Sequence, residues 1–313
     1  MDYGHEKTEE MLVALERRIE KVYREAAKET DKTIKEYFAK FQKRDEEMRA
    51  LVEAEKLSKE EYRKWRITQI ARGERYEAMR DQLAERVTKA NEVAIAYVND
   101  TTPQVYTLNR NYCAYTIEQV AGNVGFTMWD EATVKRLVAD EPELMPYYPK
   151  KRAVKRGIDL EYGKGQISAT VTSGILRGRT IGQMTEELQG RVDTLGRVNA
   201  MRAARTAVTG AQNGGRQASY EAAEKMGVRV QKKWIATLDG RTRHEHGMAD
   251  GQTVDTDKPF IVGGEKMMFP ADPTASGWLV YNCRCTMATV EKAGVDTSPV
   301  KRISYQQWAK TKG

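Results

Sequence analysis

Two of the three histidines and two of the three cysteines of the chain lie between Trp234 and Cys285. His244 and His246 are one residue apart, as are Cys283 and Cys285, so each pair would lie on one face of an extended strand. Four such side chains suit tetrahedral zinc, although cysteines of structural zinc sites are usually two to four residues apart. The alternative is a dry core in which the cysteines are buried and His246 is hydrogen-bonded in a turn. The spacing favours the dry core without a cofactor, with a structural zinc on these four candidates as the alternative.

The same segment has the atoms for a metal-dependent nuclease, because Asp239 and Asp250 flank the sequence His244-Glu245-His246. A ββα-metal nuclease also needs a metal-binding His or Asn on a helix after the hairpin, and no such residue stands in a clear helical context. The phosphate-binding loop, the nucleophile elbow and the H-E-x-x-H zinc motif are absent from the sequence. The sequence therefore favours a protein that is not an enzyme, with a metal-dependent nuclease or toxin-like enzyme as the alternative.

The elements around these residues are predicted to form a small, turn-rich β module. Turn signals recur through it, and short β-compatible runs separate them. The turns are Asp239-Gly240, Asp250-Gly251, Gly263-Gly264 and Pro270–Pro273, and the runs are Val228–Ile235, Phe260–Val262 and Trp278–Tyr281.

Each motif residue of this module has a predicted structural task. Trp234 is a buried aromatic anchor, Asp239 opens a turn and accepts from backbone amides, and Arg243 ties two loops through their carbonyl groups. A strand from Asn282 to Cys285 is expected to close the module against the strand of Trp234.

The rest of the chain is predicted to be mostly helical, which gives an α+β fold of mainly α content. Apolar residues recur at helical spacing from residue 6 to 56, and Ser58 with Glu61 forms a capping box before a second helix over 59–98, which Gly73 would kink. The predicted divisions are a helical arm at 1–98, a linking subdomain at 99–157 that begins with a helix break at Asn99–Pro103, helices followed by the β module at 158–295, and a loose tail at 296–313.

The net charge of +7 is unevenly distributed. Residues 150–235 carry 17 Lys and Arg against 7 Asp and Glu, a balance of +10, whereas residues 1–100 carry 22 against 23. A basic segment can contact DNA phosphates or an acidic partner, or it can be a solvated face. The candidates for DNA contact are Lys150, Lys151, Arg152, Lys155 and Arg156, and a general DNA-binding helical protein is a further alternative.

The three cysteines do not form a disulfide framework, so folding in a reducing cytosol is expected. Neither a signal peptide nor an apolar run long enough to span a membrane is found in the sequence, and no membrane partner is expected.

The motif string resembles the signature of the Mu F-like phage head morphogenesis family. It consists of Arg205-Thr206, Asn213-x-Gly215, Trp234, Asp239-Gly240-Arg241-Thr242-Arg243-x-x-His246, Asp250-Gly251, Pro270 and Asn282-Cys283-Arg284-Cys285. The resemblance covers roughly residues 165 to 290. The family usually carries an acidic residue after Arg-Thr, where this chain has Ala207.

The resemblance implies a structural minor head protein of a tailed bacteriophage. Such a protein associates with the portal vertex inside the capsid, assists procapsid assembly and in some cases contacts or travels with the genome. The implied partners are the portal protein, the scaffold or major capsid protein and double-stranded DNA. The implied location is the virion, after assembly in the host cytoplasm.

Overall fold

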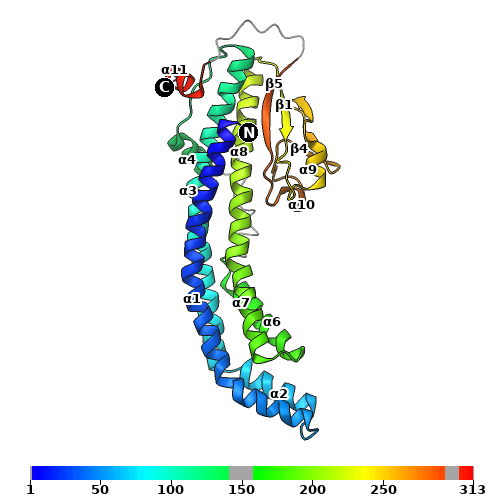
Figure 1. Cartoon of the computed structure of the whole chain (residues 1–313). Coiled ribbons are helices and arrows are strands. Elements are labelled where there is room, and N and C mark those ends of the chain that lie inside the picture. The colour runs from blue at the N-terminus through cyan, green and yellow to red at the C-terminus, as the bar shows by residue number, and fades with distance from the viewer. Residues whose placement is uncertain (1, 141–157, 293–302, 313) are drawn as a thin grey trace. The chain divides into compact units, whose positions relative to one another are not determined.

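The computed structural model describes residues 2–140, 158–292 and 303–312. The chain is mostly α-helical, with short antiparallel strands near its C-terminal end, which confirms the predicted fold class (Figure 1). In the described part, no helix is both long and apolar enough to cross a lipid bilayer.

The helices before the β module are α1 (Tyr3–Glu53), α2 (Lys59–Ile70), α3 (Glu74–Ala121), α4 (Glu131–Asp140), α6 (Leu160–Leu176), α7 (Ile181–Asp193), the π-helix η2 (Thr194–Val198) and α8 (Asn199–Lys225). The module contains β1 (Val230–Ile235), α9 (His244–Ala249), β2 (Thr253–Asp255), β3 (Phe260–Val262), β4 (Glu265–Met267), α10 (Gly277–Val280) and β5 (Thr286–Glu291), and α11 (Tyr305–Lys312) follows.

The chain divides into two compact units, each made of segments that are distant in sequence. Unit 1 comprises Met1–Glu16, Tyr97–Lys150 and Arg202–Gly313, and unit 2 comprises Arg17–Ala96 and Lys151–Met201. The division falls inside α1, α3 and α8. Contiguous ranges, such as those predicted from the sequence, do not describe units of this kind.

Unit 2 is a helical core of interlocking apolar side chains. Its fully buried members come from α1, α2, α3, α6 and α7, and they include Ile34, Ile70, Leu83, Ile167 and Leu188. The helix starts follow local chemistry. Ser58 begins α2 and Thr180 begins α7, each through a capping box that satisfies backbone amides of the first turn.

The predicted helix break at Asn99–Pro103 is wrong, because α3 continues through it. Pro103 lies inside the helix. Thr101, Thr102 and Thr107 donate hydrogen bonds from their hydroxyl groups to the carbonyl four residues earlier, at distances of 2.8 to 3.0 Å. Burial of this part of α3 in unit 1 outweighs the helix-breaking preference of proline.

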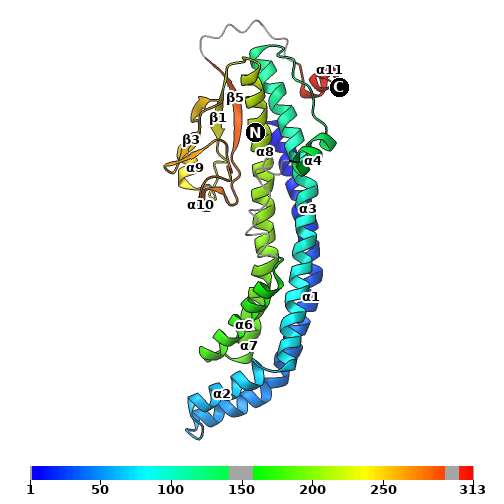
Figure 2. The same cartoon turned by 180° about the vertical axis from the view of Figure 1, so that it is seen from behind.

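Unit 1 contains the β module, which packs on α8. The main sheet has the order β2-β1-β5 and is antiparallel, with Trp234 opposite Met287, and β3 pairs with β4 in a second small sheet. Two opposite views place the main sheet between α8 and α9 (Figures 1 and 2). Gly215 permits close packing of α8 on α3, since a Cβ there would lie 2.5 Å from the Tyr106 carbonyl oxygen.

The predicted loose tail is wrong for residues 303–312, which include α11. Trp308 is buried, contacts the ring of Tyr115 and donates a 2.6 Å hydrogen bond from its indole nitrogen to Glu118. Lys312 donates a second hydrogen bond to the same carboxylate. An aromatic anchor and an ion pair therefore fix α11 on α3.

Candidate functional site: the motif module and its supporting helix

Trp234 is the anchor of the module. It occupies β1, is fully buried, and makes edge-on ring contacts with Phe260 and His246 at centroid distances of 5.3 and 5.8 Å. Its backbone is hydrogen-bonded to the Asp250-Gly251 turn, because the Gly251 amide donates to the Trp234 carbonyl. Gly251 has a φ of +77°, a conformation that glycine adopts without strain. Asp250 completes this turn by accepting a 2.8 Å hydrogen bond from the Ala236 amide.

Asp239 organises the turn that follows β1. Its carboxylate accepts a 2.9 Å hydrogen bond from the Arg241 amide, as expected for an Asp-Gly turn. The same carboxylate forms a bidentate ion pair with the Arg284 guanidinium, which donates two hydrogen bonds of 2.6 and 2.7 Å. The hydrogen bonds from Arg284 are the main reason that the pKa of Asp239 lies far below its ordinary value. Asp239 thus connects the first half of the motif to the Cys-Arg-Cys segment and is not placed as a general base.

The predicted His-x-His strand is wrong, because residues 244–249 form α9. One intervening residue turns a helix by roughly 200°, so the two side chains diverge. His246 is buried, whereas His244 is exposed on the opposite face. Of the two histidines, only His246 therefore contributes to the interior of the module.

The strand predicted over Asn282–Cys285 is also wrong, since β5 begins only at Thr286, and Trp278–Val280 lies in the helical turn α10. Asn282 has a φ of +55°, which turns the chain sharply before the cysteines. Both thiols nevertheless face α9. The Nδ1 atom of His246 lies 3.3 Å from the Cys285 sulfur and 3.7 Å from the Cys283 sulfur.

These three side chains form the His246–Cys283–Cys285 cluster, whose three ligand atoms all lie within 4.8 Å of one another. The side chains are between 1% and 3% exposed, so bulk water does not reach them. A hydrogen bond from the Cys283 thiol, reinforced by His246, lowers the pKa of Cys285 below its ordinary value. The same hydrogen bond, together with burial, raises the pKa of Cys283. The contact between the two cysteines thus shifts their pKa values in opposite directions.

Arg243 holds the cysteine segment against α9. Its guanidinium donates a hydrogen bond to the carbonyl of Tyr281, which joins the start of α9 to the loop after α10. This is the contact type predicted for Arg243, a planar donor that connects two loops through the backbone.

A stripe of polar side chains on α8 binds the backbone around the cysteines. Thr206, Thr209, Asn213 and Arg216 follow one another at helical spacing and so share one face. Thr206 accepts from the amide of Asn282 at 3.1 Å, and Thr209, Asn213 and Arg216 donate to the carbonyls of Cys283, Cys285 and Met287, the first two at 2.7 and 3.0 Å. We call these four residues the α8 stripe. It fixes the position of both cysteines from the side opposite to α9.

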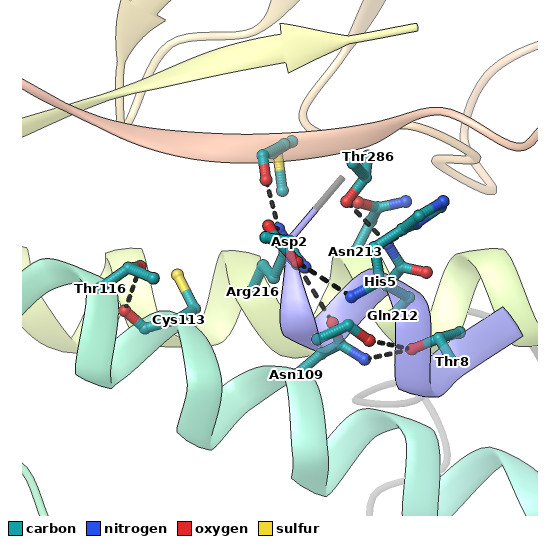
Figure 3. A network of polar contacts seen from close by, with 12 residues as sticks. Asp2, His5, Thr8, Asn109, Cys113, Thr116, Gln212, Asn213, Arg216 and Thr286 are labelled. Carbon is teal, nitrogen blue, oxygen red and sulfur yellow. Dashed lines mark hydrogen bonds and ion pairs between the residues drawn. The ribbon is translucent and has the colours of Figure 1, made fainter. Parts of the chain in front are cut away.

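The stripe ends in a buried ion pair with the first residues of the chain (Figure 3). Arg216 is 3% exposed and binds both carboxylate oxygens of Asp2, at 2.7 and 2.8 Å, and the amide oxygen of Asn109 at 3.1 Å. Burial of Asp2 disfavours its ionisation, but the hydrogen bonds and charge of Arg216 outweigh burial and lower its pKa. Gln212 lies next to this pair and bridges His5 to Thr286.

The sequence does not predict the group formed by Thr209, Gln212, Arg216 and Asp2. The polar residues at helical spacing along α8 indicate that they share one face of the helix, but this spacing does not identify the segment that they contact. Arg216 falls within the basic segment at residues 150–235, and its burial shows that it binds protein instead of solvent or phosphate. Two other cations of that segment also have protein partners, because Arg205 pairs with Glu16 and Lys232 is buried.

The five candidates for DNA contact, Lys150, Lys151, Arg152, Lys155 and Arg156, lie outside the described residues.

Similarity to known proteins is found over part of the chain and over nearly its whole length. Residues 165–288 match the model of the family described as "Phage Mu protein F like protein". The chain is 26% identical to "Minor head protein GP7" of Bacillus phage SPP1 over 96% of this chain and 94% of that protein. It is also 32% identical to the "NAD(+)--arginine ADP-ribosyltransferase EFV" of Enterococcus faecalis (strain ATCC 700802 / V583), over 41% of this chain and 26% of that enzyme. No solved structure matches.

The matched range contains the α8 stripe, Trp234, the Asp239 turn, His246 and both cysteines of the cluster. The residues that carry the sequence resemblance are thus those that the structure brings together. This part of the chain is therefore similar to the Mu F-like family of phage proteins, and the chain over nearly its whole length is similar to a minor head protein.

Proposed function

We propose that this chain is a structural minor head protein of a tailed bacteriophage, and that it acts in head assembly without catalysis. The observation that carries the proposal is the similarity to the minor head protein of phage SPP1, which extends over 96% of the chain and so includes both units. A similarity limited to the β module would support only a shared domain.

The finer proposal is that the protein binds the portal vertex inside the capsid, with the arm at residues 1–98 as the contact surface. Two features support an arm that binds a partner. The arm contains the long helix α1, and the exposed face of α1 carries charged residues such as Lys21, Lys28 and Lys32. Scaffold and major capsid proteins are the other proposed partners. A location in the virion, after assembly in the host cytoplasm, follows from the same proposal.

Co-production with the portal, scaffold and major capsid proteins of the same phage tests this function. The tagged chain should purify with heads and, in a separate pull-down, with the portal protein. Replacing Lys21, Lys28 and Lys32 with Ala should reduce incorporation. Replacing the exposed Lys225, Lys258 and Lys266 of unit 1 with Ala is the matched control and should not. Heads that form normally and lack the unaltered chain would reject the proposal.

Deleting residues 1–56 is a poorer test, although the sequence suggests that the rest would remain folded. Asp2, His5 and Thr8 belong to the polar network of unit 1. Their removal would leave Arg216 buried without its carboxylate partner, and loss of incorporation would then report unfolding.

We further propose weak, sequence-independent DNA contact through the basic segment at residues 150–235. The candidates for phosphate contact are the five cations at its start, Lys150, Lys151, Arg152, Lys155 and Arg156, whereas Arg205, Arg216 and Lys232 of the same segment make protein contacts. Replacing all five with Gln should lower the dependence of DNA affinity on salt concentration. An unchanged dependence would place the contact elsewhere, and no binding at low salt would remove the DNA role.

Catalysis is the alternative function, and the geometry gives it little support. The nuclease interpretation needs accessible metal ligands, whereas His246 is buried against two thiols and Asp239 is bound to Arg284. The similarity to the ADP-ribosyltransferase covers 26% of that enzyme, so its activity does not transfer to this chain. Nicotinamide release from NAD⁺ with an arginine-containing acceptor, and DNA cleavage with added Mg²⁺ or Zn²⁺, would each reveal an enzyme.

A further inference from the structure

The His246–Cys283–Cys285 cluster has the spacing of a metal site. Zinc bonds of about 2.3 Å to sulfur and 2.0–2.1 Å to nitrogen, at a tetrahedral angle, place a thiolate and an imidazole nitrogen about 3.5 Å apart. The two sulfurs lie 3.3 and 3.7 Å from Nδ1 of His246, on either side of this value. The distances between the three donor atoms are therefore compatible with one shared metal ion.

The donors are held in place by contacts that do not involve their ligand atoms. The carbonyls of Cys283 and Cys285 accept hydrogen bonds from Thr209 and Asn213 of the α8 stripe. On the opposite side, the edge-on contact with Trp234 orients the ring of His246. A metal site with such an outer set of contacts needs little rearrangement on binding.

The chemistry of the donors selects the metal. Two thiolates and one imidazole are soft to intermediate ligands, which favour Zn²⁺ over Mg²⁺ or Ca²⁺. Each thiol loses its proton to solvent on binding, and Zn²⁺ with two thiolates and a neutral imidazole carries no net charge. A neutral complex avoids the cost of an isolated buried charge.

A dry core explains the cluster less well. It would leave an imidazole and two thiols buried, with only weak hydrogen bonds to one another. The Nε2 atom of His246 has no hydrogen-bond partner within the described residues, so Nδ1 is the nitrogen that the surroundings engage. His244 takes no part, because it lies on the exposed face of α9.

We propose that His246, Cys283 and Cys285 bind one Zn²⁺ ion per chain, and that this ion ties α9 to the segment before β5. The burial of all three donors makes the site structural. The proposal is independent of the function proposed above, since a head protein with a dry core would still assemble.

The unaltered full-length chain provides the first test. Protein produced with zinc in the growth medium should contain one equivalent of zinc by elemental analysis. After removal of zinc, added Co²⁺ should give the thiolate-to-cobalt charge-transfer band and the intense visible bands of tetrahedral cobalt. Zinc should also protect two of the three cysteines from alkylation, with Cys283 and Cys285 as the protected pair in peptide mass spectra. Zinc-free protein in which alkylation of this pair is insensitive to added Zn²⁺ would overturn the proposal.

Matched variants localise the ion. Cys285→Ser and His246→Gln should lose stoichiometric zinc and the cobalt charge-transfer band, whereas Cys113→Ser and His244→Gln should retain both. Cys113 is buried but lies outside the cluster, so it controls for loss of any buried thiol. If a cluster variant fails to fold, the alkylation pattern of the unaltered chain still decides. Retention of one zinc in both cluster variants, with normal folding, would assign the ion to other residues.

Discussion

The two units of this protein are stabilised by different kinds of contact. In unit 2, α1, α2, α3, α6 and α7 bury aliphatic and aromatic side chains against one another, and its core includes Leu83, Ile167 and Leu188, each with no exposed surface. In unit 1, α8 meets β5 and the loop before it through hydrogen bonds from the α8 stripe to backbone groups.

The difference concerns specificity as much as stability. Apolar packing tolerates exchanges between residues of similar volume, so many sequences can build the core of unit 2. A buried polar side chain that serves a buried carbonyl has few substitutes, because loss of the donor leaves the acceptor unsatisfied. The α8 stripe therefore restricts the choice of residue at each position more than the core of unit 2 does, where side-chain volume and apolar pattern matter most.

Arg216 offers the strongest way to test this comparison. Arg216→Met removes the partner of Asp2 and of the Met287 carbonyl inside unit 1, and we expect it to destabilise unit 1 by about 3–5 kcal/mol. Hydrogen exchange resolved by peptide should show the largest loss of protection in β5 and in the first turn of α1. Asp2→Asn should cost less, since Asp2 is partly exposed. A loss of less than about 1 kcal/mol would mean that the ion pair is not central to unit 1.

Leu83 provides the apolar counterpart in unit 2. Leu83→Ala should cost about 3 kcal/mol, because it removes buried methyl groups and leaves a cavity among α1, α3 and α6. Leu83→Met keeps most of the volume and should cost less than about 1.5 kcal/mol. Urea unfolding of both variants checks this, and equal losses for Ala and Met would contradict a volume-dominated core.

The sequence predicted those features that local chemistry determines. The capping box at Ser58 and the Asp239 turn involve partners within three residues, so their geometry follows from the residues alone. The mostly helical fold with a small C-terminal β module also followed, because helical periodicity and clustered turns are local patterns.

Features that depend on distant partners were not predictable in this way. Asp2 and Arg216 are 214 residues apart, and neither local sequence indicates that the two side chains form an ion pair. The helix break expected before Pro103 failed because tertiary burial supports α3 there. The same limit applies to the cluster, since the spacing of His244 and His246 suits a strand and only the structure shows that α9 is a helix and separates them.

Lys232 tests, through the pH dependence of stability, how a buried polar side chain contributes to unit 1. Its amine donates to Gln217 and to the carbonyl of Met268, and burial lowers its pKa from 10.5 to about 8. Between these values the unfolded chain holds a proton that the folded chain has released, so stability should rise with pH. Relative to Lys232→Met, the native chain should gain about 2 kcal/mol from pH 7.5 to pH 10. Parallel urea titrations measure this, and a constant difference would show that Lys232 does not titrate in this range.

Thr209 gives the smallest and most specific effect. Thr209→Val preserves the shape of the side chain but leaves the buried Cys283 carbonyl without the 2.7 Å hydrogen bond from α8, so we expect a loss of about 1–2 kcal/mol in unit 1. Thr185→Val is the matched control in unit 2, because the Thr185 hydroxyl donates only to the Ile181 carbonyl of its own helix. Its substitution should cost less than about 0.5 kcal/mol. Urea unfolding of both variants at one pH supplies the two values. Equal losses would mean that the α8 stripe contributes no more than an ordinary hydroxyl on a helix, and the contrast between the units would then rest on Arg216 alone.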